Sequence, residues 1–394
     1  MNRALKIGLI VLSFLVTVCL TFILTVTWMK QSYTKELSKD AVDYKMQTLG
    51  LLIDQYFIDE YDPAALEVAA ADGAASAMVA ATGDRWSYYI SSTDMQAYEE
   101  QLNNAYVGIG VTIQEIEEGM EIMSVVEGGP AEEAGVQVGD ICVAVEGQRT
   151  AEIGLEKTQE IVRGEEGTYV QLRFSRDGEE FDLNVERRAI ITAVAELEML
   201  PGDIALISIV NFDYHCAEQT IACIDSAMEQ GAKGLLFDVR FNGGGLKDEM
   251  VEVLDYLLPE GELFRSVDYR GVEEVCTSDA EFVDLPMAVL VNEDSYSAAE
   301  FFAVALQEYD AAVIVGTQTV GKGNFQYTLE LGDGSAVSLS VGKYFTPSGI
   351  SLTDIGVTPD VLQELSYEDY ISLYYGSLEH ENDEQLQAAL EVFQ

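Results

Sequence analysis

The chain has 394 residues, of which 21 are Lys or Arg and 69 are Asp or Glu, so its formal net charge is −48. Hydrophobic residues make up 48% of the chain and only 7 residues are Pro, which excludes a disordered or low-complexity protein and leaves room for two or three domains. So negative a charge argues against a nucleic-acid partner, because such binding needs Lys and Arg beside phosphates. The chain has only 2 His residues, which argues separately against most zinc sites.

The first predicted element is a membrane-spanning helix. Residues 7–29 contain no charged side chain, and a helix of that length crosses a hydrocarbon core of about 30 Å. The segment ends at Trp28 and Lys30 without the small residues of a cleavage site, so we expect an uncleaved signal-anchor over residues 1–30. A cleaved signal peptide is the alternative. Basic residues ahead of the segment favour an N-terminus that stays inside and a remainder that lies outside the cytoplasm.

Two regions with different residue patterns follow, the first helical and the second β-like. Apolar residues recur at a spacing of three or four over residues 31–103, and Pro63 opens an alanine-rich helix, so we predict a helical arm that packs against the rest or forms a homodimer. Residues 104–190 contain short β-like runs separated by Gly-containing turns, with helical patterns near residues 130–135 and 155–164. This pattern predicts a compact β-rich domain with two helices.

Residues 191–365 alternate apolar strand patterns with amphipathic helix patterns. Repeated β-then-α order predicts an α/β core with buried parallel strands. Residues 366–394 are acidic and end in a helical pattern, which predicts an outer packing helix.

The cysteines offer no metal or disulfide framework. None of them shows C-x-x-C spacing, and no His/Cys cluster has the spacing of zinc ligands. We therefore predict free, mostly buried thiols at Cys19, Cys142, Cys216, Cys223 and Cys276.

One near-match to a phosphate-binding loop fails on inspection. The stretch GTQTVGKG over residues 316–323 fits G-x-x-x-x-G-K-[ST] except that Gly323 stands where the Mg²⁺-binding hydroxyl belongs. A phosphate loop must also open a helix, whereas the residues after it form a hairpin pattern that turns at 332–334. The pattern therefore disfavours a nucleotide site.

The lysine of this stretch, Lys322, is better explained as the partner of a reactive serine. Ser297 lies between a buried strand pattern and a helix, where a strand-to-helix turn presents a side chain beside free helix amides. With histidine scarce, Lys322 can act as the base if burial lowers its pKa, and Val320, Phe325 and the Ala298-Ala299 helix start would supply apolar walls.

Here a family resemblance becomes visible. The stretches SYSAAEF over 295–301 and GKGNFQ over 321–326 resemble the core of the carboxyl-terminal processing peptidases, or tail-specific proteases, which are serine proteases. The resemblance implies that Ser297 is the nucleophile, that Lys322 is its base, and that Gln326 assists the lysine. It implies no metal and no organic cofactor.

Two further stretches extend the resemblance, with departures. FDVRFNGGGL over 237–246 resembles the family's oxyanion loop, which implies that the backbone amides of Gly244 and Ala298 hold the oxyanion. GDRWSYY over 83–89 resembles an aromatic element of the family. The departures are Gly243 for a proline, which loosens the oxyanion loop, Tyr296 for a small residue, and Arg85 for a proline.

Residues 104–190 resemble a PDZ domain. Val107, Gly108, Ile109 and Gly110 would form the carboxylate-binding loop, and PAEEAGVQVGD over 130–140 matches a characteristic run. Adjacent backbone amides capture a terminal carboxylate while the tail adds as a strand, so the resemblance implies substrates with free C-terminal tails.

Together these features predict an α/β protein made of a transmembrane helix, a helical arm, a PDZ-like domain and a serine protease core. The expected function is that of a membrane-anchored, extracytoplasmic serine endopeptidase that recognises exported proteins by their C-terminal tails. The alternative is a catalytically silent PDZ adaptor that binds C-terminal peptides.

Overall fold

The computed structural model describes Thr21, residues 24–27 and residues 42–394, and the chain divides into two units after Thr82. In the first unit a helix covers residues 42–56, and α2 spans Pro63–Ala80. Pro63 lies in the first turn of α2, where a missing N–H leaves no carbonyl unpaired, and the Asp62 carboxylate caps the helix by accepting a hydrogen bond from Ala64 N at 2.9 Å. The predicted alanine-rich helix is confirmed.

The predicted membrane-spanning segment, residues 7–29, lies outside the described residues except for Thr21 and residues 24–27, which are helical. Within the described part of the chain, no helix combines the length and the apolar character that crossing a membrane requires.

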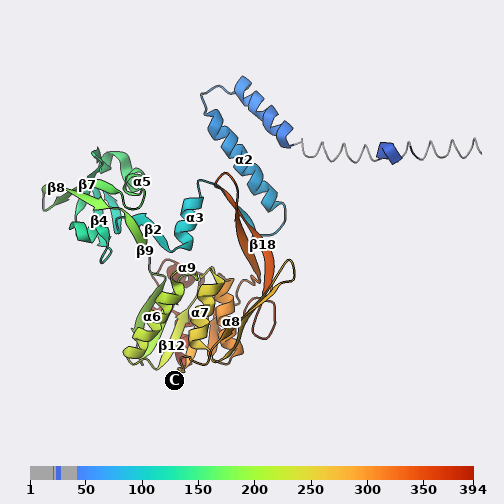
Figure 1. Ribbon diagram of the computed structural model, residues 1–394. Helices are drawn as coiled ribbons and strands as arrows, with labels where there is room; N and C mark the ends of the chain where they lie inside the picture. Colours follow the sequence, from blue (N-terminus) through green and yellow to red (C-terminus); the bar gives the residue numbers. More distant parts are fainter. Residues whose placement is uncertain (1–20, 22–23, 28–41) are drawn as a thin grey trace, which may run out of the picture. The chain divides into compact units, whose positions relative to one another are not determined.

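The second unit begins with β1 (Tyr88–Ile90) and α3 (Met95–Leu102), which a β-rich domain follows, drawn in green and cyan in Figure 1. Its main sheet has the order β3-β4-β5-β7-β8, with β6 paired to β5, and a separate pair joins β2 to β9. Buried Met120, Ile122 and Phe174 lie at the centre of its core. The elements are β2 (Ala105–Gly108), β3 (Val111–Ile116), β4 (Gly119–Val125), α4 (Pro130–Ala134), β5 (Ile141–Val145), β6 (Gln148–Arg149), α5 (Thr150–Val162), β7 (Tyr169–Arg176), β8 (Glu179–Glu186) and β9 (Arg188–Ile191).

A six-stranded sheet forms the centre of the following α/β region, in the order β10-β11-β12-β15-β16-β19. Only β10 is antiparallel to its neighbour, which confirms the predicted parallel core. The strands are β10 (Ala195–Leu200), β11 (Ile204–Ile209), β12 (Gly234–Asp238), β15 (Met287–Val291), β16 (Ala312–Gly316) and β19 (Val361–Leu362).

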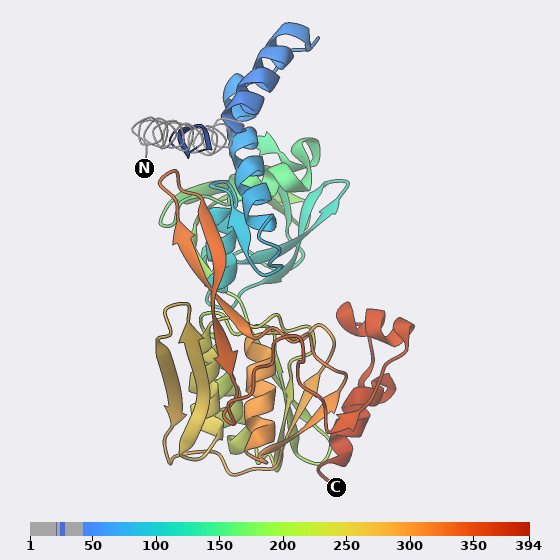
Figure 2. The same cartoon turned by 90° about the vertical axis from the view of Figure 1, so that its right-hand side faces the viewer.

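Helices cover both faces of this sheet (Figures 1 and 2). One face packs against α6 (Cys216–Glu229), α7 (Lys247–Leu257) and α8 (Ala298–Glu308), and the other against α10 (Glu384–Glu391). Every residue from 298 to 306 is buried, so α8 lies at the centre of the core. Burial of each large apolar side chain contributes roughly 1.5–3 kcal/mol, which makes α8 a rigid support for the residue that precedes it.

A second sheet contains β1 (Tyr88–Ile90), β13 (Gly261–Asp268), β14 (Glu273–Ser278), β17 (Asn324–Glu330) and β18 (Ala336–Phe345). The β17–β18 hairpin confirms the turn predicted at residues 332–334. The remaining tail contains α9 (Tyr367–Tyr374), a 3₁₀ turn (His380–Asn382) and α10, as the helical pattern at its end predicts.

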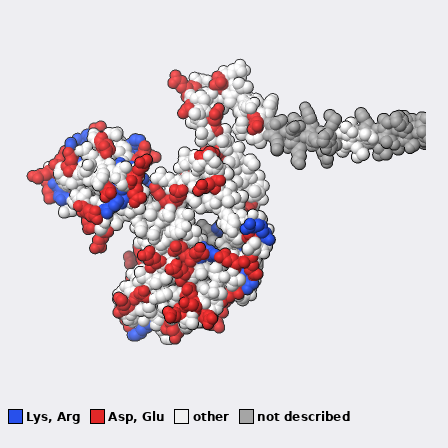
Figure 3. All heavy atoms as spheres, viewed as in Figure 1, with Lys and Arg blue, Asp and Glu red and all other residues white. Residues whose placement is uncertain are grey.

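The surface carries many of the acidic side chains that dominate the charge of the chain. Asp and Glu side chains are scattered over the visible face of the β-rich domain and over the layer of α6 and α7, interspersed with uncharged surface (Figure 3).

All four described cysteines are free, and Cys142 and Cys216 are buried, which confirms that part of the prediction. Cys19 lies outside the described residues.

Three loops leave the carboxyl ends of neighbouring parallel strands. Residues 239–246 follow β12, residues 292–297 follow β15, and residues 317–323 follow β16. Because β12, β15 and β16 are adjacent in the sheet, these loops emerge at one edge, which is where ligand sites of open α/β sheets form.

Candidate active site

Ser297 forms the sharp turn between the loop after β15 and the start of α8. Its backbone has φ 60° and ψ −124°, and 7% of the residue is exposed. A non-glycine residue held in this conformation costs on the order of 1–3 kcal/mol and persists only where its surroundings enforce it. The buried helix α8 on one side and the strand β15 on the other supply that enforcement.

Glu300 connects the serine turn to the lysine turn. Its carboxylate, in a residue that is 0% exposed, accepts hydrogen bonds from the backbone N–H of Ser297 at 2.9 Å, Gly321 at 2.7 Å and Lys322 at 2.8 Å. The Thr319 hydroxyl donates a fourth at 2.5 Å. Both oxygens of one buried carboxylate thus fix the backbones of Ser297 and Lys322 relative to each other. The four donors in turn replace the water that a buried carboxylate loses.

Lys322 lies under aromatic rings. Its Nζ is 4.8 Å from the centroid of the Trp86 ring and 5.6 Å from that of Tyr296, and the two rings pack at 5.5 Å. Burial lowers the pKa of Lys322 to about 8, against the carboxylates of Asp84 and Glu300, which raise it. Sequence reasoning anticipated the lowered pKa but named other walls: the ring contacts come from Trp86 and Tyr296.

The segment 83–89 holds the Trp86 ring in place. The Ser87 hydroxyl donates to Asp84 at 2.5 Å, Trp86 N donates to the same carboxylate at 3.2 Å, and Ser340 N donates to Ser87 Oγ at 2.9 Å. Burial alone would raise the pKa of Asp84, but hydrogen bonds from Ser340 and Ser87 and the charge of Lys322 lower it. A carboxylate fixed near the lysine therefore belongs to the site, a role that the sequence pattern did not reveal.

The side chains of the predicted dyad are not hydrogen-bonded to each other. Among the residues that the structure describes, no hydrogen bond joins Ser297 Oγ to Lys322 Nζ or Gln326 to Lys322. The Gln326 amide donates to Ser340 Oγ at 3.0 Å and to Asn324 O at 3.3 Å. The structure brings the three residues to one edge of the fold without closing the hydrogen-bonded chain between them.

In the predicted oxyanion loop, the backbone of Gly244 lies directly against the turn at Ser297. A Cβ on Gly244, whose φ is +86°, would lie 2.6 Å from Ser297 Cβ and 2.8 Å from Ala298 N, so only glycine fits this approach. The Gly244 amide donates to Asn242 Oδ1 at 2.8 Å, and Asn242 Nδ2 donates to Ile209 O at 2.8 Å. The amide that the resemblance assigns to the oxyanion thus has an intramolecular acceptor in this conformation.

The predicted carboxylate-binding loop borders an apolar cavity of about 160 Å³ in the β-rich domain. Gly108, Ile109 and Gly110 line it together with residues of β3 and α5, among them Val111 and Val162. Val107, at the third position of β2, precedes the loop and pairs in register with Ala189. Within the described residues, the amides of Ile109 and Gly110 have no hydrogen-bond acceptor. A loop with free amides beside an apolar cavity suits a terminal carboxylate followed by an apolar side chain.

The backbone strain at Ser297 gives a stability prediction. Glycine adopts φ 60° and ψ −124° readily, so Ser297→Gly should relieve about 1–3 kcal/mol of strain while adding roughly 0.5–1 kcal/mol of unfolded-state entropy. We expect Ser297→Gly to be more stable than the matched variant Ser297→Ala by about 1 kcal/mol, measured by denaturant unfolding. A Ser297→Gly variant that is less stable than Ser297→Ala by roughly 0.5–1 kcal/mol, the entropy cost alone, would show that the turn is unstrained.

Two protein-family models match parts of the chain. The model of peptidase family S41 matches residues 203–363, and a PDZ domain model matches residues 121–176. The chain is 32% identical over 379 residues to the carboxy-terminal processing protease CtpA of Bacillus subtilis (strain 168), which covers 95% of this chain and 80% of that protein.

Solved structures resemble the chain as well. The photosystem II D1 C-terminal processing protease matches with 24% identity and a TM-score of 0.47, over 86% of this chain and 97% of that one. The tricorn protease matches with 18% identity and a TM-score of 0.46, over 73% of this chain and 29% of that one. On the strength of the family models and the B. subtilis relative, the chain belongs to peptidase family S41 and is a serine-type peptidase of the carboxy-terminal processing kind that carries a PDZ domain.

Proposed function

We propose that this peptidase is anchored in the cell membrane by residues 1–30 and cleaves exported proteins outside the cytoplasm with a Ser–Lys dyad. The observation that carries the proposal is the Glu300 carboxylate, which binds the backbones of Ser297 and Lys322 together while aromatic rings bury the Lys322 amine. Nucleophile and base are thereby held in one site, and the base has a pKa that suits proton transfer near neutral pH.

In the proposed mechanism Ser297 Oγ attacks the scissile carbonyl carbon while neutral Lys322 accepts the hydroxyl proton. Lys322 then gives the proton to the leaving amine. Water next attacks the acyl-enzyme ester, and Lys322 takes a proton from the water and returns it to Ser297 Oγ as the carboxylic acid product leaves. With a pKa of about 8, roughly a quarter of Lys322 is neutral at pH 7.5, whereas an ordinary lysine of pKa about 10.4 would be neutral in about one copy in 800 at the same pH.

Three hydrogen-bonding groups must gain or change partners for this reaction. The dyad hydrogen bond closes when substrate binds, because catalytic hydrogen bonds are often open in an unliganded enzyme. Gln326 leaves Ser340 and orients Lys322. The amides of Ala298 and Gly244 hold the oxyanion, for which the Gly244 N–H shares or releases the Asn242 oxygen.

Substrate recognition is assigned to the PDZ domain. The free amides of Ile109 and Gly110 bind the terminal carboxylate, and the neighbouring cavity takes an apolar last side chain. Residues 7–29 supply the membrane helix, and the basic residues ahead of them, Arg3 and Lys6, favour an extracytoplasmic catalytic domain. Exposed Leu49, Leu52, Val68 and Met78 on the helical arm motivate homodimerisation as a further prediction.

The decisive test of the dyad is Lys322→Arg. Guanidinium keeps the positive charge but cannot accept a proton at this pH, so peptide cleavage should fall by about 100-fold or more. A fluorophosphonate should label the parent at Ser297 and fail with Ser297→Ala. Cleavage by Lys322→Arg within about tenfold of the parent would refute the dyad. A parent that binds C-terminal peptides but is neither labelled nor active would be the silent adaptor.

The Trp86 ring should set the pH dependence. Activity of the parent should rise with pH around a midpoint of about 8, because burial lowers the pKa of Lys322 to that value and only the neutral amine accepts the serine proton. Trp86→Ala admits water, so the midpoint should move up by about one unit and activity at pH 7.5 should fall roughly tenfold, while Trp86→Phe keeps a ring and should change less. A downward shift in Trp86→Ala would mean that attraction to the ring, not burial, dominates the lysine pKa.

The PDZ loop predicts dependence on a free carboxylate. A peptide with an apolar C-terminal residue should raise the turnover of a second substrate, and its C-terminal amide should not, because the amide lacks the charge that the Ile109 and Gly110 amides capture. The measurement is initial rate against effector concentration. Equal effects of acid and amide would contradict carboxylate capture, and inhibition by the acid alone would indicate recognition without activation.

A further inference from the structure

The C-terminal tail, residues 366–394, lies beyond the stretch that the peptidase family model matches and contacts both loops of the proposed site. Its last helix packs on β15 and β16, with Leu386 and Ala389 buried on the face of the sheet opposite α8. The tail is therefore fixed to the same strands whose carboxyl ends carry the active-site loops.

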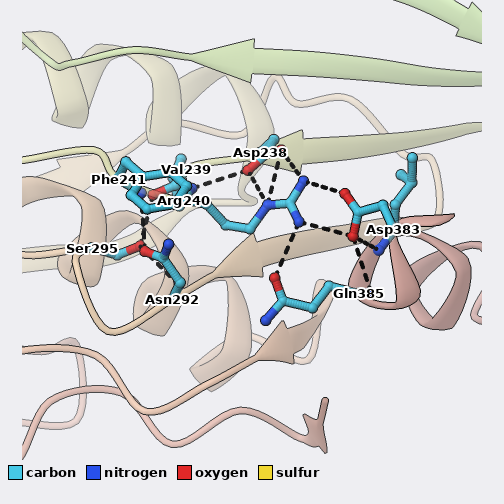
Figure 4. Close-up of polar contacts among 9 residues, drawn as sticks. Asp238, Val239, Arg240, Phe241, Asn292, Ser295, Asp383 and Gln385 are labelled. Atoms are coloured by element: carbon cyan, nitrogen blue, oxygen red, sulfur yellow. Dashed lines mark hydrogen bonds and ion pairs between the residues drawn. The ribbon is translucent and has the colours of Figure 1, made fainter. Parts of the chain in front are cut away.

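The first contact is ionic and buried. Arg240 is the second residue of the loop after β12, residues 239–246. Its side chain is 4% exposed and donates paired hydrogen bonds to Asp238. Its guanidinium also binds Asp383, with Nη2 2.9 Å from Oδ2 and Nη1 3.1 Å from Oδ1, and Nη1 lies 3.1 Å from Gln385 Oε1 (Figure 4). Asp383 is itself fixed, because its Oδ1 caps α10 by accepting from the amides of Gln385 and Leu386.

The second contact is aromatic. Phe241 has a positive φ of 60° and packs edge-on against Tyr370 at 5.1 Å and Tyr374 at 5.4 Å, both from α9. Tyr370 OH also donates to Asp294, in the loop that leads to Ser297. One tail helix thus touches the oxyanion loop and the nucleophile loop together.

We propose that residues 366–394 form a clasp in which Asp383 and Tyr374 position the oxyanion loop through Arg240 and Phe241. The inference rests on the proposed function for its catalytic meaning. The loop needs such support because three consecutive glycines, 243–245, leave its backbone few restraints of its own. Asp383 and Tyr374 touch no reacting atom in this scheme, so both are positioning residues.

The test compares Asp383→Asn with Leu386→Ala in the full-length protein. Asparagine retains the helix cap and one acceptor oxygen, but it removes the charge and offers a donor where Arg240 Nη2 needs an acceptor. Leu386→Ala weakens the packing of α10 and leaves the Arg240 contacts intact. We expect Asp383→Asn to lower kcat by about 10-fold to 100-fold with KM within about twofold, since loss of an oxyanion donor lowers kcat by about 100-fold to 1,000-fold.

Tyr374→Ala tests the aromatic arm and should lower kcat in the same way by about tenfold. A fall in kcat that Leu386→Ala reproduces, or an Asp383→Asn enzyme within about twofold of the parent, would overturn the clasp as a positioning element.

Amide hydrogen exchange at residues 239–246 separates this inference from the proposed function. Exchange there should be faster in Asp383→Asn than in the parent and in Leu386→Ala, whether or not the parent cleaves peptides. An inactive parent would overturn the proposed function and leave the exchange result to decide the clasp. Unchanged exchange in Asp383→Asn would overturn the clasp.

Discussion

The buried Glu300 carboxylate is the interaction on which the proposed site depends. Three backbone amides and one hydroxyl point at it, from the serine turn and from the segment that leads to the lysine. A carboxylate removed from water must be solvated by fixed donors, so the fold cannot move Ser297 away from Lys322 without leaving a buried charge unpaired. The relative position of the proposed nucleophile and base is thus a consequence of electrostatics in the core.

That same charge opposes the chemistry that the lysine must perform. Glu300 and Asp84 both favour protonated Lys322, and burial under Trp86 and Tyr296 favours the neutral amine. Burial is the larger effect, so the pKa of Lys322 is lowered overall despite the two carboxylates. The site therefore combines carboxylates that organise its backbone with rings that keep the base available.

Much of this arrangement could be predicted from the sequence, and the reason is topological. Strand and helix patterns alternate over residues 191–365, parallel strands share their carboxyl edge, and Ser297 and Lys322 each follow such a strand pattern. The β-rich domain and the hairpin after the lysine were likewise visible as alternating patterns. The strand β13, by contrast, carries a weak signal, because charged residues such as Arg265 interrupt its apolar pattern.

Other parts of the site had no local signal. Trp86 lies more than 200 residues before Lys322 in the chain, and no spacing links a tryptophan in a turn to a lysine after a distant strand. The pairing of Arg240 with Asp383 is equally remote, since it joins the loop after β12 to the cap of the last helix. Glu300 lies within the SYSAAEF stretch over residues 295–301, but its four donors, three backbone amides and the Thr319 hydroxyl, are brought to it only by the fold. Such contacts are set by tertiary packing rather than by residue period.

The most direct test of the account is a measurement of the Lys322 pKa itself. In protein labelled with ¹³C at lysine Cε, the Lys322 resonance, assigned by its loss in Lys322→Arg, can be followed against pH in the unliganded enzyme. The account predicts a midpoint of about 8. A midpoint near the ordinary lysine value of about 10.4 would contradict it, because the amine would then be protonated at every pH at which the enzyme is expected to work.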